Sequence, residues 1–243
     1  MTETPGQSEQ PELIQQAATI LLVRQQTTPE RLEVYMTKRP QTMRFLASHY
    51  VYPGGQMDEE DQDPRFAALA APLTPELNPE GLPLSYWVCA LREAFEEVGI
   101  LLARDASGQL IQSRNYRDVR QKMLAGEISF YDVVEQAGLT LATDSMRYFG
   151  HRLTPRKVSK KRFDTRYFLT ILPEGQTPEP HAGEVEEDGW YDVTSALAGA
   201  SQGEMDMVPP TLDSLRAIGR FQRAQDLWNS TVGVGTPTPE ELA

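Results

Sequence analysis

Three carboxylates lie within two turns of one segment and are the side chains of this chain best suited to chemistry. The segment reads Arg92-Glu93-Ala94-Phe95-Glu96-Glu97-Val98-Gly99-Ile100. Glu93 precedes Glu96 by three residues and Glu97 by four, so a helix would place all three on one face. Like charges at these spacings cost a helix about 0.2–0.5 kcal/mol each, whereas a hard cation such as Mg²⁺ binds clustered oxygens beside substrate phosphates. A solvated acidic helix end is the alternative explanation.

A glycine turn precedes this segment. The stretch Tyr52-Pro53-Gly54-Gly55-Gln56-Met57-Asp58 places a Pro-Gly-Gly turn after a short apolar run, and acidic residues continue to Asp61. Paired glycines mark backbone that adopts a positive φ or approaches another group closely. The turn therefore predicts a close contact between backbone and a second element.

Turn and helix together resemble the Nudix hydrolase signature. That signature has a glycine, an acidic residue six positions later, then Arg-Glu-x-x-Glu-Glu-x-Gly and an apolar residue. Gly55 and Asp61 match its first part, and residues 92–100 match its second part without a gap. The resemblance implies an α/β/α sandwich, an α+β fold whose mixed β-sheet is flanked by helices.

The same resemblance implies roles for the charged residues of the helix. Glu93, Glu96 and Glu97 would be the ligands of Mg²⁺ or Mn²⁺. Arg92 would orient these carboxylates by ion pairing. Glu96, Glu97 and Arg92 are therefore also candidate catalytic residues.

The chain departs from the signature in two ways. Asp61 stands where most of the family has a glutamate, and thirty residues separate it from Arg92 where the family has seven. Closing the longer loop costs only about 1.3 kcal/mol more, so the fold should tolerate the insertion. Residues 62–85 form this insertion, with a short helix expected near Arg65–Ala71. The insertion is either surface decoration or a cap over the substrate cleft.

Pattern and composition predict one domain. We expect a disordered segment at 1–13, the Nudix domain at 14–231 and a flexible tail at 232–243. Strands are expected at residues 17–24, 32–38, 50–52, 146–153, 163–172 and 189–193. Helices are expected at residues 84–98, 115–125, 129–137 and 212–228.

Composition limits the partners. The net charge of −12 argues against a nucleic-acid partner, because such affinity rests on Lys and Arg neutralising phosphates. No apolar run approaches the eighteen residues of a membrane span, and Met1–Glu12 does not resemble a secretory signal. We therefore expect a cytoplasmic enzyme without a membrane partner, and a homodimer by analogy with relatives that dimerise.

The second half of the chain narrows the branch of the family. Five basic residues lie between Arg156 and Arg162, and an acidic stretch, Glu184–Asp188, precedes Trp190. With Val208-Pro209-Pro210-Thr211 before the last helix, this order resembles the coenzyme A diphosphatase (motif-19-like) branch. The resemblance spans roughly residues 17–221 and implies cleavage of coenzyme A or acyl-CoA to 3′,5′-ADP and 4′-phosphopantetheine or its acylated form.

Substrate contacts are predicted from charge and from the glycine turn. Arg39 and Arg44 are expected to pair with the phosphates of the substrate. The alternative is that both are ordinary surface arginines. In Arg162-Phe163-Asp164-Thr165-Arg166, alternate residues share one face of a strand, which is either a substrate face or a solvent-exposed ion-pair ladder. The candidate substrate-binding residues are Arg39, Arg44, Gly54, Gly55, Arg162 and Arg166.

The reaction expected for this branch is in-line attack of water on one phosphorus of the diphosphate, with a general base beside that water. Glu97 is one candidate base. Glu184 is another, because in several relatives a glutamate six residues before the strand tryptophan approaches the metal cluster; Glu187 is the alternate. Two other functions stay open: hydrolysis of ADP-ribose, another nucleoside-diphosphate sugar or a dinucleotide, and nucleotide binding without cleavage.

Overall fold

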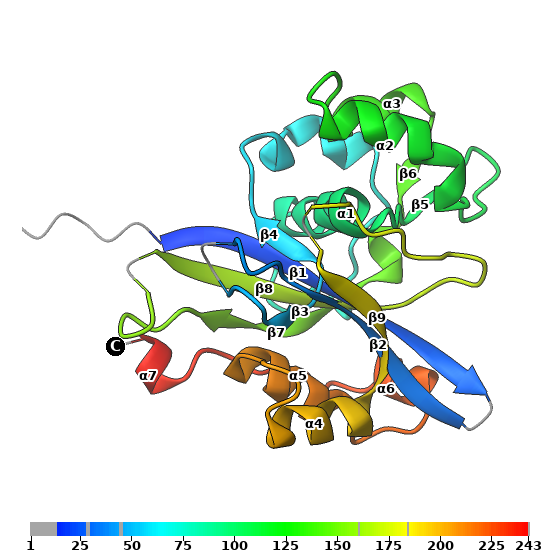
Figure 1. Cartoon of the computed structure of the whole chain (residues 1–243). Helices are drawn as coiled ribbons and strands as arrows, with labels where there is room; N and C mark the ends of the chain where they lie inside the picture. The colour runs from blue at the N-terminus through cyan, green and yellow to red at the C-terminus, as the bar shows by residue number, and fades with distance from the viewer. Residues whose placement is uncertain (1–13, 28–29, 44–45, 160, 184, 243) are drawn as a thin grey trace, which may run out of the picture.

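The fold is a mixed β-sheet between two layers of helices, as predicted (Figure 1). The structure, a computed structural model, describes residues 14–27, 30–43, 46–159, 161–183 and 185–242. The strands are β1 Ile14–Thr27, β2 Glu30–Lys38, β3 Tyr50–Val51, β4 Gly54–Gln56, β5 Ala103–Arg104, β6 Thr140–Leu141, β7 Arg147–Leu153, β8 Arg162–Ile171 and β9 Glu187–Asp192. The helices are α1 Ser85–Val98, α2 Arg117–Leu124, α3 Phe130–Gln136, α4 Val193–Gln202, α5 Pro209–Ile218, α6 Ala224–Asn229 and α7 Pro239–Leu242.

The sheet is built around β1, its longest strand. The main strand order is β3-β2-β1-β8-β7, with β4 paired to β1 and β9 paired to β2. β1 runs parallel to β8 and antiparallel to β2 and β4. Alternate residues of β1 enter different cores: Ile20 and Leu22 pack under α1, and Leu21 and Val23 pack under α4–α6. The glycine turn in β4 therefore lies beside the strand that supports both helical layers.

Two helices of the α1 layer end or begin as the sequence predicts. α1 ends at Gly99, whose φ of 67° places it in the left-handed region, and the N–H groups of Gly99 and Ile100 donate to the carbonyls of Phe95 and Ala94. The bond from Gly99 to Phe95 forms the αL motif that ends many helices. α3 begins after Ser129, which makes a capping box with Asp132.

The predicted helix 212–228 is wrong in one respect, because it is two helices. Residues 219–223 separate α5 from α6. The side chain of Gln25 in β1 donates to the carbonyl of Gln222 and accepts from the N–H of Ala224, so it satisfies backbone groups released at the break. Pro209 and Pro210 start α5 earlier than predicted, since proline suits the first turn of a helix.

The C-terminal segment is packed, in contrast to the predicted flexible tail. The N–H of Val234 donates to the carbonyl of Phe149, and the N–H of His151 donates to the carbonyl of Gly235. Val234 and Glu241 are buried. Residues 232–242 thus add to the outer edge of β7, through backbone pairing that side-chain pattern does not reveal.

The insertion covers the α1 layer. Pro64–Ala68 forms a 3₁₀ helix in place of the short helix expected at 65–71. The ring of Phe66 contacts the rings of Phe130 and Tyr131 in α3. The N–H of Ala71 donates to the carbonyl of Leu141, and the N–H of Leu141 donates to the carbonyl of Leu69. Across the part of the chain that is described, no helix is both long enough and apolar enough to span a membrane.

Candidate active site

Arg92 is the centre of a buried charge cluster at the middle of α1. Its Nε and Nη2 atoms each lie 2.8 Å from a different carboxylate oxygen of Asp61. Its Nη1 lies 3.0 Å from Glu93 Oε1 and 2.7 Å from Glu96 Oε2. Arg92 and Asp61 are only 5% and 2% exposed. Asp61, from the loop after the glycine turn, therefore holds the arginine that in turn holds two of the three glutamates.

The glycine turn lies directly against the same carboxylates. The N–H of Gly54 donates to Glu97 Oε2 at 3.1 Å. A Cβ atom at Gly55 would lie 2.4 Å from Glu93 Oε1, and one at Gly54 would lie 2.5 Å from the carbonyl oxygen of Ala18. Both positions need glycine because side chain and backbone approach too closely for a Cβ atom.

Gly55→Ala is therefore expected to disturb the carboxylate cluster without unfolding the chain. The new methyl group must push the Glu93 carboxylate away, so we expect hydrolytic activity to fall about tenfold or more while the melting temperature changes little. Gly189→Ala is the matched control, since its Cβ would meet only the ring of Tyr191 at an ordinary 3.5 Å. Equal activities for the two variants would contradict a role for Gly55 in placing Glu93.

Burial and crowding shift the acidity of the cluster. Burial of Glu93, reinforced by the neighbouring Glu97 and Glu96 and opposed by Arg92, raises its pKa to about 8. Burial also raises the pKa of Glu96, against the opposing charge of Arg92. Carboxyl groups with raised pKa values gain most from an added positive charge, so the cluster favours binding of a cation.

The donor set fits a divalent metal ion in its chemistry. Carboxylate oxygens are the donors that Mg²⁺ and Mn²⁺ prefer. Within the described ranges, no three acidic, histidine or cysteine side chains converge on one point as metal ligands. Glu93 and Glu96 face Arg92 and Glu97 faces Gly54. A cation held by Glu93, Glu96 and Glu97 would therefore draw carboxylate oxygens away from these partners.

The segment that leads into β9, residues 179–186, is called the acidic loop here, and its first residues meet the C-terminal end of α1. The N–H of His181 donates to the carbonyl of Glu97, and the N–H of Glu179 donates to the carbonyl of Val98, both at 2.7 Å. Glu184, the predicted base, lies outside the described residues. The alternate, Glu187, accepts hydrogen bonds from Tyr50 and Tyr191 on the sheet face of α4 and α5. It therefore points away from the α1 carboxylates.

Asp188 lies on the α1 side of the sheet, in contrast to Glu187. Its carboxylate accepts a 2.6 Å hydrogen bond from the hydroxyl of Tyr35, whose ring belongs to the α1 core. Alternation along β9 explains why adjacent acids face opposite sides. Asp188 was not among the predicted site residues, although Trp190, two residues later, packs on that core and so indicates the same face.

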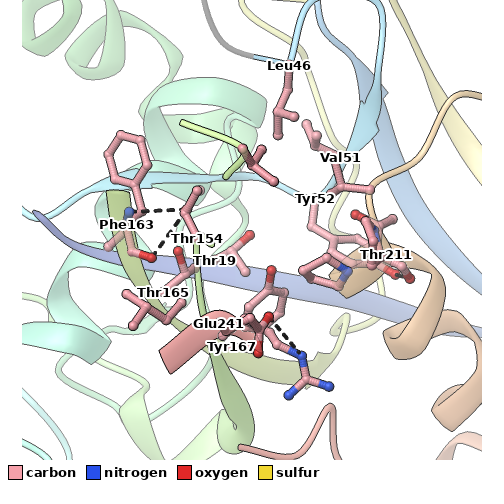
Figure 2. A pocket seen from close by; sticks show the side chains of 18 of the residues that line it. Thr19, Leu46, Val51, Tyr52, Thr154, Phe163, Thr165, Tyr167, Thr211 and Glu241 are labelled. Carbon is pink, nitrogen blue, oxygen red and sulfur yellow. Dashed lines mark hydrogen bonds and ion pairs between the residues drawn. The ribbon is translucent and has the colours of Figure 1, made fainter. Parts of the chain in front are cut away.

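A pocket of 590 Å³ opens on the other face of the glycine turn (Figure 2). Gly54, Gly55 and Arg39 line it next to the turn. Apolar side chains that share this lining come from several loops and strands: Leu46, Val51, Leu153, Val158, Phe163, Tyr167, Val208, Pro209 and Pro210. Lys161 stands at the loop that follows β7, and its ammonium lies 5.0 Å from the ring centre of Phe163. The pocket is thus largely apolar, and its charged lining residues are Arg39, Arg152, Lys161, Asp213 and Glu241.

Comparison with known proteins decides the family. The family model described as the NUDT19 Nudix domain matches residues 76–218, which is more than half of the chain. This chain belongs to the NUDT19 Nudix domain family.

Individual relatives agree with this assignment. The chain is 24% identical to human acyl-coenzyme A diphosphatase NUDT19 over 84% of its length and 23% identical to the chicken (Gallus gallus) protein of the same name over 80%. It spans 65% and 63% of the lengths of these two relatives. A crystal structure of a NUDIX hydrolase from Alicyclobacillus acidocaldarius matches with a TM-score of 0.80 at 27% identity, covering 93% of this chain and 100% of that one.

In this Nudix domain, two of the predicted substrate-binding residues lie away from the pocket. Arg162 is 1% exposed, and it donates from Nε to the carbonyl of Thr154 and from Nη2 to the carbonyl of Glu241. Arg166 pairs with Asp164 and lies over the ring of Tyr86 in α1. The pocket face of β8 carries Phe163, Thr165 and Tyr167 instead. Neither Arg162 nor Arg166 therefore lines this pocket, and their contact with a substrate stays a prediction.

The other predicted substrate residues divide into two groups. Arg39, Gly54 and Gly55 line the pocket, and Arg44 lies outside the described residues.

The insertion 62–85 contributes no lining residue to the 590 Å³ pocket. It lines a separate cavity of 410 Å³ together with Gln16 and Asp61. Of the two explanations for the insertion, this placement favours a role outside the main pocket.

Proposed function

We propose that this Nudix domain hydrolyses the diphosphate linkage of coenzyme A or an acyl-coenzyme A, yielding 3′,5′-ADP and 4′-phosphopantetheine or its acylated form. The observation that carries the proposal is the cluster of three glutamates on α1, held by Arg92 beside a glycine turn that also borders a 590 Å³ pocket. The names of the NUDT19 relatives support the choice of substrate.

Glu93, Glu96 and Glu97 would hold the divalent metal ion, Mg²⁺ or Mn²⁺. The metal supplies positive charge that offsets the negative charge of the diphosphate and lowers the barrier to attack by water. Arg92 keeps Glu93 and Glu96 at the surface of α1 that faces the turn. Gly54 and Gly55 allow the diphosphate to approach the carboxylates, because no side chain projects from the turn.

When water attacks one phosphorus of the diphosphate, the second phosphate leaves with the bridging oxygen. A carboxylate must accept a proton from the attacking water during this step. Glu97 is one candidate, since it is fixed by the N–H of Gly54 and lies on the helix end that contacts the acidic loop. Glu184 of that loop is the second candidate. The backbone contacts of Glu179 and His181 with α1 support a base from this loop.

The pocket suits the organic part of the substrate. Its apolar lining matches a pantetheine arm or a short acyl chain, and Lys161, with the exposed Arg156 and Lys157 in the same loop, adds positive charge at one side. We propose that this basic loop contacts the 3′-phosphate of coenzyme A, because charged hydrogen bonds to phosphate are stronger than neutral ones.

Dephospho-coenzyme A is accordingly expected to be a poorer substrate than coenzyme A. Loss of one charge-assisted contact should lower kcat/KM about tenfold or more. Lys161→Gln should reduce the preference for the 3′-phosphorylated substrate, whereas Lys122→Gln, on exposed α2, should leave it unchanged. Equal kcat/KM values for the two substrates with the unaltered chain would contradict the proposed phosphate contact.

A substrate panel tests the function as a whole. Coenzyme A, acetyl-coenzyme A, ADP-ribose and NADH would each be incubated with Mg²⁺ and with Mn²⁺, and nucleotide products would be separated by chromatography. We expect 3′,5′-ADP from the two coenzyme A substrates at the highest kcat/KM. Preferred cleavage of ADP-ribose or NADH would overturn the substrate, and no product from any compound with folded protein would indicate a binding module.

A further inference from the structure

The last carbonyl groups of α1 are satisfied from outside the helix. The carbonyls at a helix C-terminus have no intrahelical partner. The carbonyl of Glu96 accepts from Arg120 Nη2 at 2.7 Å and from Arg120 Nε at 3.3 Å. The carbonyls of Glu97 and Val98 accept from the N–H groups of His181 and Glu179. Three consecutive carbonyls of the glutamate-bearing helix are thus tied to α2 and to the acidic loop.

Arg120 connects these two attachments. Its Nη1 donates to the carbonyl of Glu179 at 2.8 Å, so one guanidinium bridges the end of α1 and the start of the loop. Arg120 is 4% exposed, and its positive charge lies at the helix end where the macrodipole is negative. Gly99 leaves room for it, since a Cβ atom there would lie 3.0 Å from Arg120 Nη1.

The far end of the loop is also fixed. Lys38 forms a 3.1 Å ion pair with Glu186, and Tyr35 donates to Asp188. The loop therefore spans two anchored points, with Arg120 and the α1 carbonyls at one of them. The separation between this loop and the side chain of Glu97 depends on both anchors.

We propose that Arg120 is a positioning residue of the active site, which sets the distance between the carboxylates of α1 and the acidic loop that follows Glu179. The inference rests on the proposed function, because it assigns the loop to the hydrolytic site. Arg120 acts through the backbone of Glu96 and Glu179 and does not itself touch the substrate.

The chain offers a matched control one turn earlier in α2. Arg117 also contacts Glu179, but it pairs with the carboxylate at the surface, and its side chain is 59% exposed. Replacing Arg117 removes a positive charge near Glu179 but leaves the hydrogen bonds from Arg120 to the carbonyls of Glu96 and Glu179 in place. Arg117→Gln and Arg120→Gln therefore separate general charge effects from the bridge between α1 and the loop.

Amide hydrogen exchange on the protein without metal or substrate tests the bridge directly. In Arg120→Gln and Arg120→Lys, we expect the amides of residues 176–183 to exchange about tenfold faster, because their opening no longer breaks the guanidinium bonds. Lysine keeps the charge but cannot bond two carbonyls at the spacing of a guanidinium. Arg117→Gln should exchange at the unaltered rate. Unchanged exchange in both folded Arg120 variants would overturn the proposal.

Measurement of kcat and KM is the second test of a positioning role for Arg120. With the substrate identified by the panel above, Arg120→Lys should lower kcat about 10- to 100-fold and alter KM less than threefold, since misplacement of a reacting group affects the chemical step. Faster loop exchange with unaltered kcat would overturn a role in positioning. If the unaltered chain cleaves no compound in the panel, the proposed function fails, while the exchange data still decide whether Arg120 anchors the loop. If Arg120→Gln does not fold, Arg120→Lys carries both measurements.

Discussion

Glu97→Gln is expected to reduce kcat by roughly 10²–10⁴-fold while the protein stays folded. The amide has the shape of the carboxylate and still accepts the hydrogen bond that the N–H of Gly54 makes to Glu97 at 3.1 Å. It lacks the negative charge needed to hold a cation or to take a proton from water. The expected loss therefore concerns chemistry and metal binding, measured as kcat with acyl-coenzyme A and as Mn²⁺ affinity by electron paramagnetic resonance.

Glu127→Gln is the control for this substitution. Glu127 is exposed in the turn after α2, so the same change of charge occurs away from α1. We expect its turnover and Mn²⁺ affinity to equal those of the unaltered chain. Full turnover in Glu97→Gln, or Mn²⁺ affinity unaffected by that change, would contradict both the proposed metal site and the hydrolytic mechanism.

The parts of the fold that local sequence determines were predicted well. The bounds of α1 follow from apolar periodicity and from Gly99, which alone accepts the left-handed conformation without strain. The capping box at Ser129 and Asp132 likewise depends on residues three apart. In such cases the interacting groups are neighbours in the chain, so their spacing carries the information.

Which face of a strand meets a site depends on long-range register, and there the sequence was insufficient. Alternation groups Asp164 with Arg166, which form an ion pair, but it does not say whether that face meets α1 or the pocket. The parallel pairing of Ala18 with Arg166 decides it, and both residues turn toward the α1 layer. The same limit applies to Glu187 and Asp188, adjacent acids on opposite faces.

Contacts through backbone groups escaped prediction for a related reason. Arg120 acts on the carbonyls of Glu96 and Glu179, which carry no residue-specific signal. Val234 and Gly235 pair with β7 through backbone groups, and the carbonyl of Glu241 accepts from Arg162 of β8, whose burial no local pattern reveals. The spacing of residues in α2 was the available signal for Arg120. Arg120 precedes the buried Met123 by three residues and therefore lies on the buried face of the helix, whereas the other charged residues of α2 are exposed.

The Asp61–Arg92 pair couples the stability of the domain to its active site. Asp61 stands where most of the family has glutamate, yet it reaches both Nε and Nη2 of Arg92 at 2.8 Å. The surrounding carboxylates, with Asp61 first, raise the pKa of Arg92 in spite of burial, which acts to lower it. The guanidinium therefore stays charged in the interior and requires its partners.

Asp61→Ala is accordingly expected to lower the free energy of unfolding by about 3 kcal/mol, the low end for breaking a buried ion pair. The low end applies because Arg92 keeps Glu93 and Glu96 as partners. The N–H of Asp58 also loses its acceptor, Asp61 Oδ2. Urea denaturation at neutral pH, followed by circular dichroism, measures the change.

Asp63→Ala makes the comparison specific, because Asp63 forms a two-point pair with Arg65 two residues along the same loop. That pair is exposed, with the Arg65 side chain 63% accessible, so water replaces the lost contact and we expect a far smaller change. If both variants lose the same stability, burial is not the cause and Asp61 is an ordinary surface partner. If Asp61→Ala alone is destabilised, the residue that replaces the usual glutamate supports the fold through the arginine that holds Glu93 and Glu96.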